Sequence, residues 1–231
     1  MINALVRPLA LFVGLAVVLA GCGPSNTTSA PPAQASAAQG SPAANGSPAA
    51  AGDCPTAQPP ALAAGETRTV SIATAKGEIL IHVEADLSPI AAGNFVALAE
   101  CGWYDGVVFH RVVPDFVIQG GDGEHGRSPN VDPSLVGTGG PGYTIADEPV
   151  TALYSRGIVA MARTRQPNSV GSQFFIILDD GARTSLASAN TYQIIGAVAT
   201  GMEAVDAITA AADAELPTEP VVMTDVSVSG N

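Results

Sequence analysis

From residue 67 onward, short apolar segments alternate with turn residues, and this pattern constrains the fold more than any other feature of the chain. Residues 69–73 and 78–83 show the period of two that is typical of half-buried strands, and Lys76-Gly77 between them indicates a hairpin. Further segments of strand length are residues 107–113, 116–119, 158–162, 174–178, 192–198 and 221–228. The chain is therefore predicted to be mainly β.

Two helices are predicted among these strands. The first begins at Ser88-Pro89, an N-cap followed by Pro at the first helical position, and ends before Gly102. A second, shorter helix follows Gly201. Eight strands in a flat sheet would leave long exposed edges, which closure removes. We therefore predict one domain over residues 63–231, a closed eight-stranded antiparallel barrel capped by two α-helices.

The first 62 residues lack this pattern. Arg7 precedes an apolar run over residues 9–20, which is too short to cross a bilayer as a helix and has the length of a signal-peptide core. The sequence Leu19-Ala20-Gly21-Cys22 resembles the bacterial lipobox, whose Cys is lipidated and becomes the first mature residue. Residues 1–21 are therefore predicted to be a lipoprotein signal peptide; an ordinary cleavable signal with an incidental Cys is the alternative.

Residues 22–62 are predicted to be a disordered, low-complexity tether. They consist mainly of Ala, Ser, Pro and Gly, with Asp53 as the one charged residue, and cannot bury enough apolar surface to offset the entropy of ordering. We expect the protein to be exported and held by lipid on Cys22 at the outer face of the cell membrane, or at the outer membrane where the cell has one.

Two cysteines, Cys54 and Cys101, remain if Cys22 is lipidated. An even pair in an exported protein suits a disulfide, which would join the end of the tether to the end of the first predicted helix. Two unpaired thiols are the alternative, and the sequence leaves both open.

Charge and motif spacing exclude several functions. The net charge is −12 and Lys76 is the single lysine, so nucleic-acid binding is not expected. Residues 121–128 nearly match a P-loop and residues 137–142 a dinucleotide fingerprint, but no helix can follow either segment, so both are interpreted as loops. The three histidines, His82, His110 and His125, share no metal-ligand spacing, and no metal site is predicted.

Two blocks of the sequence carry the chemistry. Residues 109–122 read FHRVVPDFVIQGGD, and residues 167–178 read PNSVGSQFFIIL. Both resemble the signature of the cyclophilin family of peptidyl-prolyl isomerases, and the similarity extends from about Thr67 to Val228. The resemblance implies an eight-stranded antiparallel barrel with two helices, in agreement with the pattern of strands, and catalysis of rotation about X–Pro bonds without a cofactor.

Arg111 is the catalytic residue that this resemblance and the chemistry together predict, with Phe116 and Gln119 beside it. Twisting the X–Pro amide localises a lone pair on the prolyl nitrogen, and a guanidinium can donate a hydrogen bond to it only near the transition state. The resemblance implies that a proline pocket is lined by Phe116, Val117, Phe175 and Leu186. It also implies that Gln119 and Gln173 orient the substrate backbone and Arg111. Main-chain contacts to the residues before proline would come from Ala162, Arg163 and Thr164.

The sequence departs from the family at several of these positions. Val117 stands where Met is frequent, Arg163 where Asn is common, and Tyr192, also predicted to bind substrate, where His is usual. Thr184 and Ser185 precede Leu186 where well-known eukaryotic members carry a tryptophan, so we expect weak cyclosporin binding.

The predicted function is isomerisation of X–Pro bonds in unfolded exported proteins and proline-containing peptides, by a monomer anchored in the membrane. A non-catalytic proline-peptide-binding module or holdase on the same fold is the alternative. A solute-binding transport lipoprotein is disfavoured because such chains are usually larger and bilobal.

Overall fold

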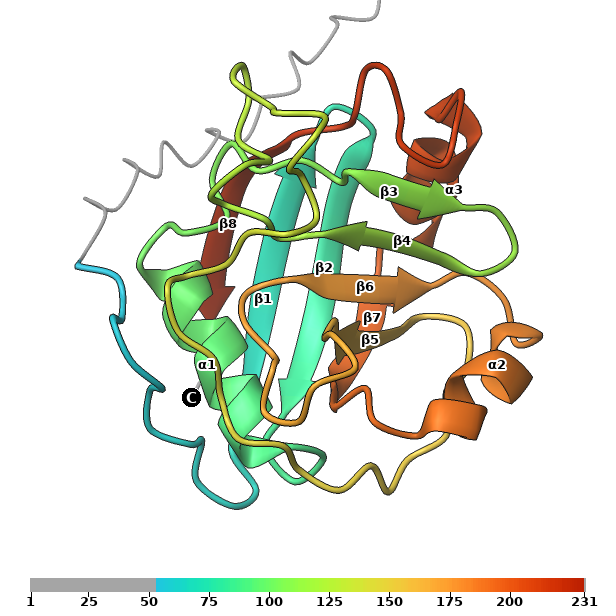
Figure 1. Cartoon of the computed structure of the whole chain (residues 1–231). Coiled ribbons are helices and arrows are strands. Elements are labelled where there is room, and N and C mark those ends of the chain that lie inside the picture. Colours follow the sequence, from blue (N-terminus) through green and yellow to red (C-terminus); the bar gives the residue numbers. More distant parts are fainter. Residues whose placement is uncertain (1–52, 231) are drawn as a thin grey trace, which may run out of the picture. The chain divides into compact units, whose positions relative to one another are not determined.

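The computed structural model describes residues 53–230 (Figure 1), so the predicted signal peptide and Cys22 lie outside the described residues. The elements are β1 (Thr67–Thr74), β2 (Gly77–Glu84), α1 (Pro89–Glu100), β3 (Arg111–Val113), β4 (Val117–Gly120), β5 (Ile158–Met161), β6 (Phe174–Ile177), α2 (Ala182–Ala189), β7 (Ile194–Thr200), α3 (Met202–Ala211) and β8 (Met223–Ser229).

All eight strands belong to one antiparallel sheet, in the order β3-β4-β6-β5-β7-β2-β1-β8. The mainly β, eight-stranded antiparallel prediction is confirmed. The sheet is curled; its two end strands, β3 and β8, do not pair directly, but backbone hydrogen bonds join residues 106–109 to residues 221–223. The seam is joined by an isolated bridge between Val108 and Val222. The N–H of Val112, within β3, donates instead to the carbonyl of Glu215, in the loop before β8.

Alternating side chains of the sheet form the main core beneath α1. Val70 and Ile72 of β1 and Ile79 of β2 are almost fully buried, as the period of two predicted. Phe95 of α1 packs edge to face on Phe174 of β6, with ring centroids 5.2 Å apart. Such rings bury large apolar areas, so this packing fixes α1 against the sheet that carries the site.

The N-terminus of α1 is capped by a residue far away in the sequence. The helix follows Ser88, as predicted, but the hydroxyl of Ser88 makes no capping bond and is buried without a hydrogen-bond partner among residues 53–230. The two oxygens of Glu148 accept the N–H groups of Ile90 and Ala91, at 2.8 and 2.9 Å. A carboxylate at this end also interacts favourably with the helix dipole. Ser88 is thus the N-cap residue, as predicted, but the side-chain capping bonds come from Glu148.

A third helix, α2, was not predicted. Its sequence, ARTSLASA, buries only Ala182 and Leu186, a single i, i+4 pair that is too short an apolar stripe to predict a helix. It ends at Asn190 in the left-handed conformation, which Asn tolerates better than most residues. The helix lies beside β5 and β6 (Figure 1) and supplies Leu186 to the site described below.

Residues 53–62 belong to the folded domain rather than to a disordered tether. The N–H of Leu62 donates to Pro89 at 3.1 Å, and Gln58 accepts the N–H of Ala146 at 2.9 Å. A Cβ on Gly93 of α1 would collide with the carbonyl oxygen of Pro60, so this segment lies directly on the helix. The assignment of the tether through residue 62 is therefore too long.

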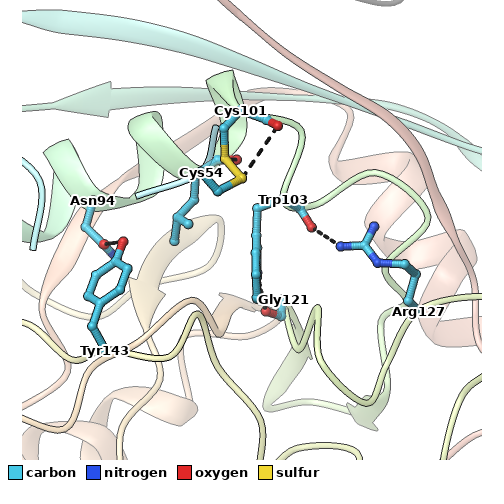
Figure 2. Close-up of a disulfide and its surroundings, with 8 residues drawn as sticks. Cys54, Asn94, Cys101, Trp103, Gly121, Arg127 and Tyr143 are labelled. Carbon is cyan, nitrogen blue, oxygen red and sulfur yellow. Dashed lines mark hydrogen bonds between the residues drawn. A yellow bond between two sulfur atoms is a disulfide. The ribbon is translucent and has the colours of Figure 1, made fainter. Parts of the chain in front are cut away.

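A disulfide fastens the start of this segment to the end of α1 (Figure 2). Cys54 and Cys101 are bonded, with their Cα atoms 5.2 Å apart. Two residues later, Trp103 donates from Nε1 to the carbonyl of Gly121 at 3.4 Å. Its ring fills the space that a Cβ on Gly123 would need. The end of α1 is thus linked through Trp103 to the loop that follows β4.

Candidate active site

Four adjacent strands place polar and apolar side chains in one row across the sheet. Arg111 of β3 is the cross-strand partner of Gln119 of β4, which is in turn the partner of Phe175 of β6. Phe175 is the partner of Ala160 of β5. Directly opposed residues on antiparallel strands project from the same face. The strand register therefore brings Phe175, which lies 56 positions after Gln119 and 64 after Arg111, to the same side of the sheet as both.

A small cavity of about 120 Å³ opens on this face. Its lining consists of Arg111, Phe116, Val117, Gln119, Ala162, Arg163, Phe175, Leu186 and Tyr192, all of them residues that the sequence assigned to the site. The volume is far below that of a typical pocket for a drug-sized ligand. The cavity therefore suits one compact side chain.

The inner wall of the small cavity is apolar. Val117, Phe175 and Leu186 are each less than 5% exposed and form part of a second core cluster. The ring of Tyr192 meets that of Phe175 edge to face, with centroids 5.4 Å apart. Because these side chains are held by the core, the wall is preformed and excludes water from whatever enters. Ser185, next to Leu186, is exposed on α2.

Arg111 stands at the polar side of the same cavity. Its side chain is 32% exposed, and its Nε donates to Oε1 of Glu215 at 2.7 Å. A guanidinium has five N–H donors, and only one of them lies on Nε, so the four on its Nη atoms remain for other partners. Arg111 thus combines a permanent charge, partial exposure and a fixed orientation. The sequence offered no signal for Glu215, which lies 104 positions away.

Gln119 and Gln173 connect the small cavity to a larger one. Gln119 donates from Nε2 to Oε1 of Gln173 at 2.9 Å, and Gln173 donates from Nε2 to the carbonyl of Gly139 at 2.8 Å. The larger cavity, of about 720 Å³, is lined by both glutamines and by Thr164, and shares Gln119, Ala162 and Arg163 with the small one. Among the described residues neither glutamine bonds to Arg111, whose Nε donates to Glu215 instead.

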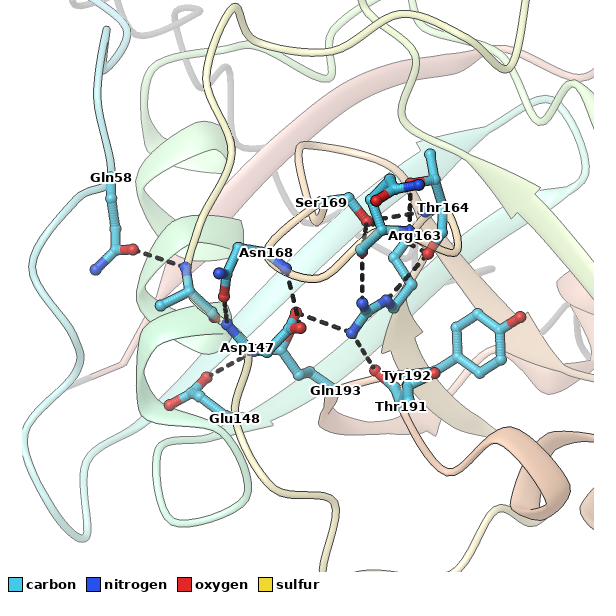
Figure 3. A network of polar contacts seen from close by, with 12 residues as sticks. Gln58, Asp147, Glu148, Arg163, Thr164, Asn168, Ser169, Thr191, Tyr192 and Gln193 are labelled. Carbon is cyan, nitrogen blue, oxygen red and sulfur yellow. Dashed lines mark hydrogen bonds and ion pairs between the residues drawn. The ribbon is translucent and has the colours of Figure 1, made fainter.

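The guanidinium of Arg163 is bound by other groups of the protein (Figure 3). Its side chain is only 8% exposed and forms an ion pair with Asp147 at 2.8 Å. It also donates to the carbonyl of Gln166 at 2.6 Å. Asp147 itself accepts the N–H of Asn168 at 2.9 Å. Although Arg163 lines both cavities, its guanidinium shapes the loop over residues 163–169 instead of pointing freely into the groove.

Asp122 organises the wall of the larger cavity, a role that no sequence pattern indicated. Its carboxylate is buried and accepts the N–H groups of Glu124 and His125 and, from the second glycine-rich segment, those of Gly137 and Gly139, at 2.7–3.1 Å. Burial by itself would raise the pKa of Asp122, but these four donors favour the charged form and lower the pKa overall. The two glycine-rich segments are therefore loops that meet on one carboxylate.

His110, beside Arg111 in the sequence, is buried and neutral. It is 3% exposed, and neither ring nitrogen has a hydrogen-bond partner among the described residues. Burial lowers its pKa to about 4, an effect that the nearby charge of Asp122 only partly offsets. Within residues 53–230, no group of three or more His, Cys, Asp or Glu side chains could hold a metal ion.

Comparison with known proteins places this geometry in a family. Residues 69–228 match the family described as cyclophilin type peptidyl-prolyl cis-trans isomerase/CLD. A probable peptidyl-prolyl cis-trans isomerase of Brucella abortus is 38% identical over 157 residues, which cover 67% of this chain and 78% of the relative. A peptidyl-prolyl cis-trans isomerase of Streptomyces antibioticus is 33% identical and covers 70% of this chain and 99% of its own.

Solved structures agree with these relatives. A cyclophilin type peptidyl-prolyl cis-trans isomerase of Cryptosporidium parvum has a TM-score of 0.60 and 29% identity, covering 72% of this chain and 99% of its own. The same protein in the presence of the dipeptide Ala-Pro has a TM-score of 0.58 and 30% identity, covering 71% of this chain and 99% of its own.

Proposed function

Because the chain belongs to the cyclophilin family and is a peptidyl-prolyl cis-trans isomerase, we propose that Arg111 is its catalytic residue and that proteins unfolded after export are its substrates. The single observation that carries the role of Arg111 is its position. One charged donor with free Nη groups stands at the edge of a small apolar cavity, in a row with Gln119 and Phe175.

The chemistry needs a donor and a dry pocket. Amide resonance gives the X–Pro bond a rotation barrier of about 18–20 kcal/mol. When the bond twists, conjugation is lost and the prolyl nitrogen becomes a hydrogen-bond acceptor. A bond from Arg111 to that nitrogen forms only in the twisted state, so it lowers the barrier instead of tightening substrate binding. No covalent bond breaks and no proton is transferred.

The apolar wall acts on the other side of the same amide. Phe116, Phe175 and Leu186 would enclose the pyrrolidine ring and exclude water from it. The twisted amide is less polar than the planar one, so removal of water costs it less. The larger cavity, which adjoins the small one at Gln119 and Ala162, would hold the residues before proline.

Two variants test the role of Arg111. Arg111→Ala removes the donor, and Arg111→Lys keeps the charge but loses the rigid fork. We expect kcat/KM for a short X–Pro peptide, followed by exchange NMR, to fall about hundredfold in Arg111→Ala, comparable with the loss of one preorganised donor in other enzymes. Arg165→Ala is the matched control, because Arg165 is exposed and lines neither cavity. Turnover equal to wild type in Arg111→Ala would refute the assignment.

Export and anchoring rest on the first 62 residues. The support is the lipobox-like sequence before Cys22 and the low-complexity composition that follows it. The protein would then act as a monomer near the surface to which it is anchored. Mass spectrometry of the protein from a membrane fraction of its natural host should find diacylglycerol on an N-terminal Cys22, and Cys22→Ala should release the protein from that fraction. An unmodified Cys22 would refute the anchor.

A further inference from the structure

The loop between α3 and β8 reaches back to Arg111 through one acidic residue. Glu215 places Oε1 2.7 Å from Nε of Arg111, while the carboxylate itself remains 60% exposed. Among residues 53–230, this is the one side-chain carboxylate within ion-pair distance of Arg111. It lies outside both blocks that carry the family signature.

The main chain holds Glu215 in place. The N–H of Val112, the neighbour of Arg111, donates to the carbonyl of Glu215 at 2.8 Å. The loop is closed on itself by a bond of 2.9 Å from the N–H of Thr218 to Oδ1 of Asp213. Glu215 therefore extends the edge of the sheet beside β3, and its side chain leaves that edge next to the side chain of Arg111.

The contact restricts the guanidinium without using the donors that the reaction needs. Arg111 is long and one-third exposed, so without a partner it would sample many rotamers. The bond at Nε fixes the plane of the guanidinium and leaves the Nη donors free. Because the carboxylate is largely in water, its charge cancels little of the charge on Arg111.

We propose that Glu215 is a positioning residue for isomerisation: it orients Arg111 so that the Nη groups meet the twisted prolyl nitrogen. This inference rests on the proposed catalytic role of Arg111. Preorganisation of a donor acts on the transition state more than on the bound ground state. Loss of Glu215 is therefore expected to lower kcat and to leave the KM for an X–Pro peptide unchanged.

The test compares Glu215→Ala with Glu215→Gln in the full chain, using exchange NMR to separate kcat from KM. An exposed ion pair contributes only a modest free energy to holding its two side chains together. The kcat of Glu215→Ala should therefore fall about two- to fivefold. Gln keeps an oxygen acceptor at the same reach and should restore most of the rate. Glu219→Gln is the control, because Glu219 is an exposed carboxylate of the same loop without a polar side-chain contact among the described residues.

A spectroscopic readout separates positioning from general damage to the loop. The Nε–H of Arg111, assigned by its absence in Arg111→Lys, should exchange with water more slowly in wild type than in Glu215→Ala. A kcat for Glu215→Ala equal to that of wild type, or higher, would overturn the inference, as would unchanged exchange of the Nε–H. A fully active Arg111→Ala would also refute the proposed catalytic role of Arg111. An inactive Arg111→Ala together with a Glu215→Ala that matches wild type would refute only the positioning role of Glu215.

Discussion

Gln173 receives a hydrogen bond from Gln119 and passes one on to the carbonyl of Gly139, at 2.9 and 2.8 Å. One amide thus ties the strand that carries the small cavity to the glycine-rich loop that bounds the large one. The two glutamines lie 54 positions apart in the sequence. Gln119 is in β4, Gln173 directly precedes β6, and these two strands are paired in the sheet. The two cavities are therefore parts of one continuous groove.

Removing this link should affect long substrates more than short ones. Gln173→Leu removes both side-chain bonds, each worth about 1 kcal/mol, and loosens the wall at Gly139. We expect KM to rise about fivefold for a peptide with several residues before proline, and to change much less for a peptide with a single residue before proline, which enters the larger cavity least. Gln166→Leu, at an exposed position that lines neither cavity, is the control. An equal rise for both peptides would contradict a role specific to the larger cavity.

His110 should make the stability of the domain fall in mild acid. Its pKa is lowered by burial to about 4, below its ordinary value of 6.5. Between these values the unfolded chain binds a proton that the folded chain does not, so the free energy of unfolding decreases as the pH falls through this window. The loss contributed by His110 is about 3 kcal/mol when the pH has dropped below both values.

Urea unfolding at several pH values from 7 to 4 measures this effect. Substitution His110→Phe, which keeps an aromatic ring and cannot titrate, should flatten the dependence relative to wild type. The exposed His82 provides the control, and His82→Gln should leave the slope unchanged. Identical slopes for wild type and His110→Phe would show that His110 does not titrate as its burial implies.

The disulfide between Cys54 and Cys101 should stabilise the domain without taking part in catalysis. It closes a loop with a sequence separation of 47, for which the chain-entropy relation gives about 4 kcal/mol. Neither cysteine lines either cavity. We expect the double variant Cys54→Ser, Cys101→Ser to lower the free energy of unfolding by up to that amount and to keep kcat/KM at 25 °C. A reductant should reproduce the loss in wild type and have no effect on the double variant.

Capping of α1 depends on Glu148 and not on Ser88. Glu148→Ala leaves the N–H groups of Ile90 and Ala91 without their carboxylate and should destabilise the domain by about 2 kcal/mol. Ser88→Ala should change stability by less than about 0.5 kcal/mol, because its hydroxyl makes no bond to lose. Thermal and urea unfolding of both variants checks this order, and a larger loss in Ser88→Ala would reverse the assignment.

Local patterns predicted most of the fold. The hairpin of β1 and β2, the helix α1 and six further strands follow from period-two alternation, turn residues and a Pro at the helix start. These features depend on neighbours within a few residues, which the sequence displays directly. The helix α2 was missed because Ala182 and Leu186 alone face the core, and residues 53–62 were missed because Pro- and Ala-rich composition hides their contacts with α1.

The sequence by itself determined the residue types of the site: a guanidinium, two amides and an apolar set in two blocks, all of which line the two cavities. Tertiary structure alone decided their partners. Arg111 bonds to Glu215 across 104 positions, Glu148 accepts the N–H of Ile90 in α1 across 58 positions, and Asp122 accepts N–H groups from both glycine-rich loops. Such pairings are set by strand order and loop closure, which bring distant residues together and leave no periodic trace in the chain.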